Sequence, residues 1–173
     1  MESLRKGIAM LLALALQAAS TLPAPGDGFA EHAFAHFSRA PALAHSSETV
    51  DVALAYVPYS TAPAAYTMRL TRRRFQQSDA IFWADSRSCP AMRPVLDAMR
   101  AVALPNPRVP GIDSDGDIIM DGAGYRLTTM ARFADGQDGE LGYSSNVGTP
   151  LAAWVDHSLA ALARCWSSRP PEG

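Results

Sequence analysis

Four aspartates lie close together in the segment GIDSDGDIIMDGAGYRL, residues 111–127, and their carboxylates could supply oxygen ligands to a calcium ion. Counted from the first aspartate, they occupy positions 1, 3, 5 and 9 of an EF-hand loop, at Asp113, Asp115, Asp117 and Asp121. The segment departs from that motif where the motif is most specific, because Ile118 replaces the turn glycine and Gly124 replaces the bidentate glutamate. We therefore reject an EF-hand and keep an irregular calcium-binding loop as an alternative hypothesis.

The same segment also has the composition of two turns with a short strand between them. DSDG and DGAG combine aspartate, which hydrogen-bonds to its own backbone, with glycine, which tolerates positive φ. Residues 118–120 are apolar, and an alternating run begins at Tyr125. We prefer this interpretation, because turns and a hairpin use every one of these residues without a ligand.

A hydrolase triad could draw its residue types from one segment, with Ser144 or Ser145 as nucleophile, His157 as base and Asp156 as the acid. The surrounding GYSSN is not the Gly-x-Ser-x-Gly elbow, and a catalytic triad is defined by geometry rather than by spacing. The serines equally suit a loop that leads to a helix cap, and His157 suits the polar side of that helix. A small exported hydrolase is therefore an alternative hypothesis.

Two further groups of residues could bind ligands. His32 and His36 are four residues apart and would share one side of a helix, but Glu31 precedes the pair and local spacing fixes no third zinc ligand. The run Arg72, Arg73, Arg74 could hold a phosphate or a carboxylate. On a strand, Arg73 points away from the other two, so Arg72 and Arg74 are the candidates for an anion site and a solvated strand end is the simpler interpretation.

The first 20 residues are typical of a signal peptide. Arg5 and Lys6 precede an uncharged, Leu- and Ala-rich run over residues 7–19, and a segment rich in proline and glycine follows. This run is shorter than the roughly 20 apolar residues that a membrane-spanning helix needs. We expect cleavage between Ala18 and Ala24, export to the periplasm or the extracellular space, and no stable membrane span afterwards.

Charge and composition narrow the class of protein. Removing residues 1–20 takes away Glu2, Arg5 and Lys6 and leaves 16 acidic and 13 basic residues, a net charge of -3. That balance argues against nucleic-acid binding. Lys6 is the only lysine, and the preference for arginine, alanine, proline and glycine suggests a bacterial source. A mature chain of this size suits one domain with a sizeable core.

The chain contains two cysteines, Cys89 and Cys165, and an even count in an exported protein predicts a disulfide. Neither cysteine belongs to a Cys-x-x-Cys motif. The alternative is that Cys89, just before a predicted helix, is a nucleophile whose thiolate the helix N-terminus favours. We prefer the disulfide, which would tie the start of the first helix to the end of the last helix.

Periodicity predicts an α+β domain over residues 49–173, after a signal peptide over 1–20 and a linker or arm over 21–48. Strands are predicted at 49–56, 66–75, 80–84, 118–120, 125–133 and 141–145 because apolar and polar residues alternate or short apolar runs occur. Helices are predicted from Met92 and from Pro150, the second capped by Thr149. The expected order, approximately βββα-βββα, favours antiparallel sheet with two antiparallel helices on one face. Within the arm, residues 28–40 could form two or three helical turns.

No catalytic motif survives these tests, while caps, turns and a disulfide account for most of the polar residues. We therefore predict a non-catalytic exported module without a cofactor, which binds a partner or an envelope component through its sheet face or its arginine-bearing edge. The identity of that partner is not encoded in any motif of the sequence.

Overall fold

The computed structural model describes residues 29–55, 63–106, 109, 111–112 and 122–171. Within these ranges the chain forms a short 3-10 helix, six strands and two α-helices. Their bounds are η1 Phe29–His32, β1 Ala33–Pro41, β2 Ser46–Ala55, β3 Ala65–Arg74, β4 Ala80–Asp85, α2 Met92–Met99, β5 Ala123–Arg132, β6 Asp138–Ser145 and α3 Pro150–Ala161. The predicted signal peptide and residues 118–120 lie outside the described residues.

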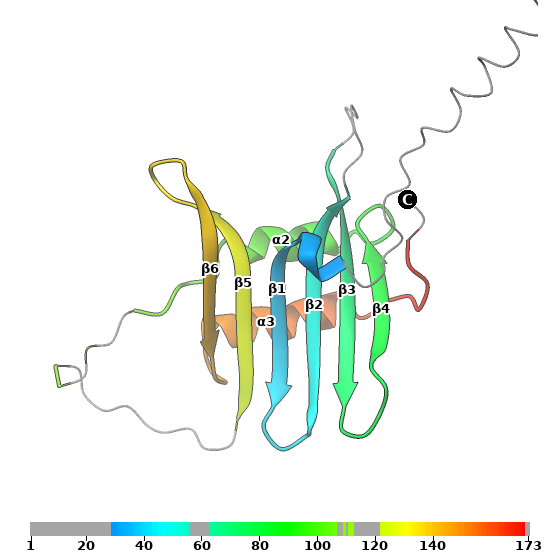
Figure 1. The fold of residues 1–173 in the computed structure, drawn as a ribbon, viewed down its shortest axis with the longest axis horizontal. Helices are drawn as coiled ribbons and strands as arrows, with labels where there is room; N and C mark the ends of the chain where they lie inside the picture. The colour runs from blue at the N-terminus through cyan, green and yellow to red at the C-terminus, as the bar shows by residue number, and fades with distance from the viewer. Residues whose placement is uncertain (1–28, 56–62, 107–108, 110, 113–121, 172–173) are drawn as a thin grey trace, which may run out of the picture.

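The strands form one antiparallel sheet in the order β4-β3-β2-β1-β5-β6. Strands β1 to β4 are antiparallel neighbours in chain order, and β5 and β6 add a further hairpin on the other side of β1 (Figure 1). The sheet therefore has two edges. Ser167 makes a short bridge to Trp83 at the β4 edge, whereas β6 forms the other edge.

Strand β1 differs from the prediction, which placed residues 33–41 in a linker or arm with helical turns. It lies inside the sheet and pairs with both β2 and β5. The local composition is rich in alanine, which favours a helix, and only Ala35 and Phe37 mark a buried strand face. Pairing on both sides outweighs this local preference, so the folded domain begins before Thr49.

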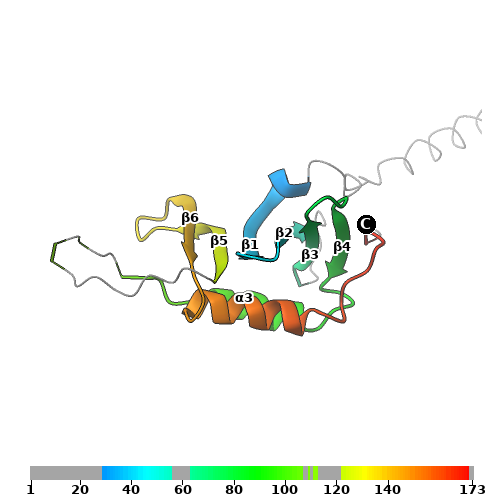
Figure 2. The ribbon, with the colours of Figure 1, turned by 90° about the horizontal axis from the view of Figure 1, so that it is seen from below.

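Both α-helices cover the same face of the sheet, and η1 lies on the other side (Figure 2). The predicted alternation is confirmed, because Met68 and Leu70 are fully buried under the helices while Arg69 between them points to the opposite face. The largest fully buried side chains form the core between sheet and helices; these are Phe37, Met68, Leu70, Met92, Leu151, Leu162, Val50, Val52 and Val155.

The helix signals in the sequence are also confirmed. The Thr149 hydroxyl accepts a hydrogen bond from the Ala152 N–H (3.1 Å), and Pro150 occupies the first helical position of α3. In α2, the buried residues Met92, Val95 and Leu96 lie on the predicted stripe. None of the helices in the described ranges is long and apolar enough to cross a membrane.

The predicted disulfide joins Cys89 and Cys165, whose Cα atoms are 5.6 Å apart. It ties the start of α2 to the end of α3, and the two helices run antiparallel as expected (Figure 1). The Cys89 N–H donates to the Asp85 carbonyl (2.8 Å). Burial raises the pKa of the Asp85 carboxyl, but hydrogen bonds and charge from Arg87 outweigh burial and hold that pKa below its usual range. The α+β fold class with an antiparallel sheet and two main helices is therefore confirmed.

Candidate binding surfaces

The predicted hydrolase residues are distributed over different parts of the fold. Ser144 and Ser145 are consecutive in β6, so their side chains point to opposite faces of the sheet. The Ser145 hydroxyl is hydrogen-bonded to Thr149 (2.8 Å), next to the cap of α3. His157 is exposed on α3, and within the described residues no hydrogen bond joins it to either serine. The hydrolase with these residues stays a prediction, and no contact described here supports it.

The predicted metal ligands are also not brought together by the described part of the chain. Asp113, Asp115, Asp117 and Asp121 lie outside the described residues, so the calcium hypothesis stays a prediction. His32 belongs to η1 and His36 to β1, so the two histidines do not share a helix face as expected. In the parts of the chain that the structure describes, no three His, Cys, Asp or Glu side chains are grouped so that they could hold a metal ion.

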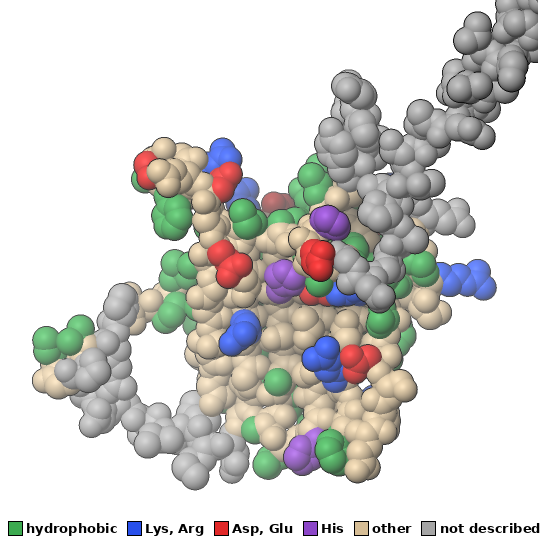
Figure 3. Space-filling view, viewed as in Figure 1, with side chains coloured by type: hydrophobic (Ala, Val, Ile, Leu, Met, Phe, Trp, Pro, Cys, Tyr) green, Lys and Arg blue, Asp and Glu red, His purple; other side chains and the backbone are tan. Residues whose placement is uncertain are grey.

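The sheet face opposite the α-helices is the first candidate surface, and we call it the open face. Figure 3 views this face, and its middle is mostly tan, since few large apolar or charged side chains project there. Antiparallel sheets commonly expose one face to water, so exposure by itself identifies no site. What distinguishes this face is one row of side chains, directly paired across five strands, which are Thr128, His36, Asp51, Arg69 and Trp83.

Three residues of this row form a fixed hydrogen-bonded cluster. His36 Nδ1 lies 2.8 Å from Asp51 Oδ1, and an ionised carboxylate only accepts, so this nitrogen donates. Arg69 donates to the other oxygen, Oδ2, from Nε (3.0 Å) and from a terminal nitrogen (2.7 Å). The Asp51 side chain is only 6% exposed, whereas that of His36 is 34% exposed. The buried carboxylate therefore orients a histidine that remains accessible.

The 3-10 helix η1 shields the other end of this cluster. The Phe29 ring lies 5.3 Å from the Arg69 guanidinium carbon and packs edge-on against Trp83 with ring centroids 5.1 Å apart. This cover explains how Arg69 and Asp51 are both largely removed from water on a face that has no helix layer. Removing water strengthens the ion pair and raises the cost of breaking it.

Asp51→Ala should lower the free energy of unfolding by about 3 kcal/mol, toward the lower end for buried ion pairs because Arg69 keeps some exposure. The loss arises because Arg69 and His36 both lose their carboxylate partner. Urea unfolding followed by circular dichroism measures it. Thr49→Ala, two residues away on the same strand face, is the matched control and should change stability by less than about 0.5 kcal/mol. Equal stability of the two variants would contradict this account of the cluster.

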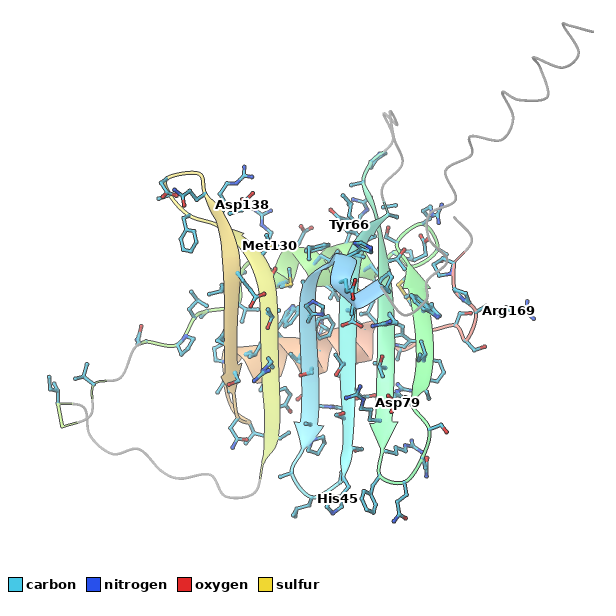
Figure 4. All side chains as sticks on the ribbon, viewed as in Figure 1. His45, Tyr66, Asp79, Met130, Asp138 and Arg169 are labelled. Atoms are coloured by element: carbon cyan, nitrogen blue, oxygen red, sulfur yellow. A yellow bond between two sulfur atoms is a disulfide. The ribbon has the colours of Figure 1, made fainter. Side chains whose placement is uncertain are left out.

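The second candidate surface lies at the sheet end where the β1–β2 and β3–β4 turns are side by side. We define the hairpin tip as Leu43, His45, Arg73, Arg74 and Phe75. The Phe75 N–H donates to the His45 carbonyl (2.9 Å), and the two rings are 5.6 Å apart. An open hollow of about 420 Å³ lies between the turns, lined by Pro41, His45, Ser46, Ser47, Arg73, Arg74, Phe75 and Asp79. Figure 4 labels His45 and Asp79 at this end.

Apolar and cationic side chains are both exposed at the hairpin tip. Leu43 is 77% exposed and Phe75 is 67% exposed. Arg73 pairs with Asp79 (3.1 Å), while Arg74 is exposed and, within the described residues, has no acidic partner. The tip therefore combines two projecting apolar side chains with one guanidinium that is available to an anion.

The two predicted anion-binding arginines have separate environments. Arg72 is directed toward the helix side, where its Nε donates to Glu48 (2.9 Å) and its guanidinium lies over the Phe82 ring. Glu48 also accepts a hydrogen bond from Arg39 (2.6 Å). Arg74 alone of the pair lines the hollow. An anion site at this end of the sheet would therefore use Arg74 rather than the predicted pair.

The hairpin between β5 and β6 lies at the opposite end of the sheet, where Figure 4 labels Met130 and Asp138. It also exposes a phenylalanine, Phe133, at 59%. Its arginine is paired, because Arg132 Nε donates to Asp138 (2.8 Å), and Asp135 adds another carboxylate to the turn. The β5–β6 hairpin thus offers exposed apolar surface with acidic surroundings, and it provides an internal comparison for the hairpin tip.

Neither surface was predicted from the sequence as a group of residues, although several of its members were noted individually. Alternation placed Arg69 on the polar side of its strand, and His36 was considered only as a metal ligand. No local pattern shows that these two side chains share Asp51. At the hairpin tip, the sequence placed Phe75 at the end of a strand and Leu43 in the arm, and only the pairing of β2 with β3 brings the turns that carry them to the same end of the sheet.

Comparison of the chain with protein-family models, with curated proteins and with solved structures gave no match.

Proposed function

We propose that the protein is an exported module that attaches to an anionic membrane surface through its hairpin tip. The observation that carries this proposal is the combination of exposed Leu43 and Phe75 with Arg74, which lines the hollow and has no acidic partner within the described residues. Isolated apolar side chains are common on protein surfaces. Two that project from neighbouring turns, close to an exposed guanidinium, match the chemistry of a bilayer interface, which is apolar below and anionic above.

The expected free energies of membrane binding are small enough that attachment should be reversible. A Leu or Phe side chain contributes roughly 1.5–3 kcal/mol when it is fully transferred from water, and partial insertion contributes less. A basic residue near an anionic leaflet contributes about 1 kcal/mol. With two apolar side chains and one exposed arginine, attachment should depend strongly on both the apolar and the cationic component. The overall negative charge of the chain would favour an orientation with the hairpin tip toward the lipid.

We also propose that the protein is exported. The Cys89–Cys165 disulfide supports it, because such bonds persist in oxidising compartments. The predicted signal peptide over residues 1–20 gives independent support from the sequence. An exported bacterial protein would meet anionic lipid at the envelope, which is the setting that the hairpin tip fits.

Co-sedimentation of the full chain with lipid vesicles tests the attachment. The wild-type protein should bind vesicles of phosphatidylcholine and phosphatidylglycerol in equal parts more strongly than vesicles of phosphatidylcholine alone. Because the apolar run over residues 7–19 is present in every variant, the informative quantity is the difference between variants. Leu43→Ser with Phe75→Ser should lower the bound fraction on both vesicle types, and Arg74→Glu should remove the preference for phosphatidylglycerol.

Phe133→Ser with Met130→Ser is the matched control, since it removes two exposed apolar residues from the acidic β5–β6 hairpin. It should bind as the wild type does. Equal losses in the tip variant and the control variant would mean that general surface hydrophobicity, and not the hairpin tip, governs binding. Unchanged binding of the tip variant would also overturn the proposal.

A further inference from the structure

We infer that His36, oriented by Asp51, is a general base that hydrolyses carboxylic esters on the open face. This activity lies beyond the proposed attachment and uses different residues. It also differs from the predicted Ser144 or Ser145 hydrolase, because the base is His36 and the nucleophile is water. The hydrogen bonds of the His36, Asp51 and Arg69 cluster fix which nitrogen of the imidazole is free.

The cluster assigns the protonation pattern of the neutral imidazole. Nδ1 carries the proton that it donates to Asp51, so Nε2 carries the lone pair. Within the described residues Nε2 has no hydrogen-bond partner, and the side chain is one-third exposed. A buried carboxylate that holds Nδ1–H while Nε2 faces the reaction space is the arrangement by which aspartate supports a histidine base. Arg69 holds the Asp51 carboxylate in place by donating two hydrogen bonds to its second oxygen.

Beyond His36, the row continues with two small residues. Thr128 lies directly across from His36 on β5, and the next residue in the row is Gly142 on β6, which has no side chain. Arg126 is exposed on the same face, opposite Ser38, and is diagonal to His36 across the β1–β5 pair. Diagonal neighbours are about 7–8 Å apart, within reach of an arginine side chain. Within the described residues no carboxylate pairs with Arg126, so its guanidinium is available to an oxyanion.

The reaction needs no oxidant or cofactor. Nε2 of His36 takes a proton from water as the water oxygen forms a bond to the ester carbonyl carbon. The carbonyl oxygen becomes an oxyanion, which the Arg126 guanidinium stabilises. When the carbon–oxygen bond to the leaving group breaks, protonated His36 gives its proton to the alkoxide. The products are a carboxylic acid and an alcohol.

Hydrolysis of p-nitrophenyl acetate by the full chain tests this inference. His36→Asn should lower kcat/KM by about 100-fold, the lower end of the range for a positioned general base. His32→Asn is the matched control, since His32 is an exposed histidine of η1 outside the cluster, and its loss should leave kcat/KM within about two-fold of wild type. Asp51→Asn, measured below its melting temperature, should lower kcat and leave KM unchanged, because Asp51 positions the base without touching the ester.

Two results would overturn the inference. Equal small losses in His36→Asn and His32→Asn would mean that the ester reacts with any surface histidine. A large loss in His157→Asn with none in His36→Asn would assign the activity to the predicted serine site. Circular dichroism of each variant distinguishes a catalytic loss from unfolding. None of these outcomes depends on vesicle binding, so the attachment and the hydrolysis succeed or fail separately.

Discussion

Replacing both cysteines by alanine should lower the free energy of unfolding by about 4 kcal/mol. The disulfide closes a loop across a sequence separation of 76 residues, and it restricts the unfolded chain much more than the folded one. Its loss also frees the start of α2 from the end of α3. Urea unfolding of the wild type and of the Cys89→Ala, Cys165→Ala variant measures the difference, with the midpoint moving to lower urea for the variant.

Addition of a reductant provides the control for this experiment. It should destabilise the wild type by a similar amount and leave the alanine variant unchanged, since that variant has no bond to reduce. Cys89 is buried, so truncation to alanine also removes a small amount of packing, and the variant should be slightly less stable than the reduced wild type. A wild type that unfolds at the same urea concentration with and without reductant would contradict the expected contribution.

Phe37→Ala should destabilise the domain by about 3–5 kcal/mol. Phe37 is 1% exposed and lies in β1, with its ring edge-on to Trp154 of α3 at a centroid distance of 4.9 Å. The same side chain therefore joins the inside of the sheet to the helix layer. Its truncation leaves a cavity between rigid elements, which can close only in part. Thermal unfolding by circular dichroism should show a clearly lower Tm than for the wild type.

Phe75→Ala is the matched control for Phe37→Ala, because it makes the same chemical change at an exposed position. Its effect on stability should stay within about 0.5 kcal/mol. This pair also tests the position of β1 in the fold. If residues 21–48 were a linker or arm, Phe37→Ala would be as harmless as Phe75→Ala, and a small effect at Phe37 would contradict the packing described for β1.

The two candidate surfaces follow from the way the sheet is covered. Helices α2 and α3 take the apolar face, so the remaining polar positions collect on the open face and at the strand ends. The His36, Asp51 and Arg69 cluster lies within the open face, while the hairpin tip is formed by turns beyond the strands. A single chain can therefore carry an attachment surface and an acid–base site without either one disturbing the core.

Much of the local structure could be predicted from the order of residues alone. Alternation in β3 placed Met68 and Leu70 opposite Arg69, and Thr149 with Pro150 marked the start of α3. The two cysteines predicted their own pairing, because a chain with two cysteines has one possible internal bridge. The strand and helix features succeed because they depend on neighbours within one turn or one strand, where backbone geometry and side-chain spacing decide the outcome.

The candidate surfaces required the tertiary structure. His36 and Asp51 are 15 residues apart and Asp51 and Arg69 are 18 apart, and only the strand register places them in one row. A shift of one residue would turn each side chain to the opposite face. That register is set by burial of Phe37, Val50 and Leu70 under the helices, which is a property of the whole core. The sequence by itself therefore determined which residues are polar, and long-range packing decided which of them meet.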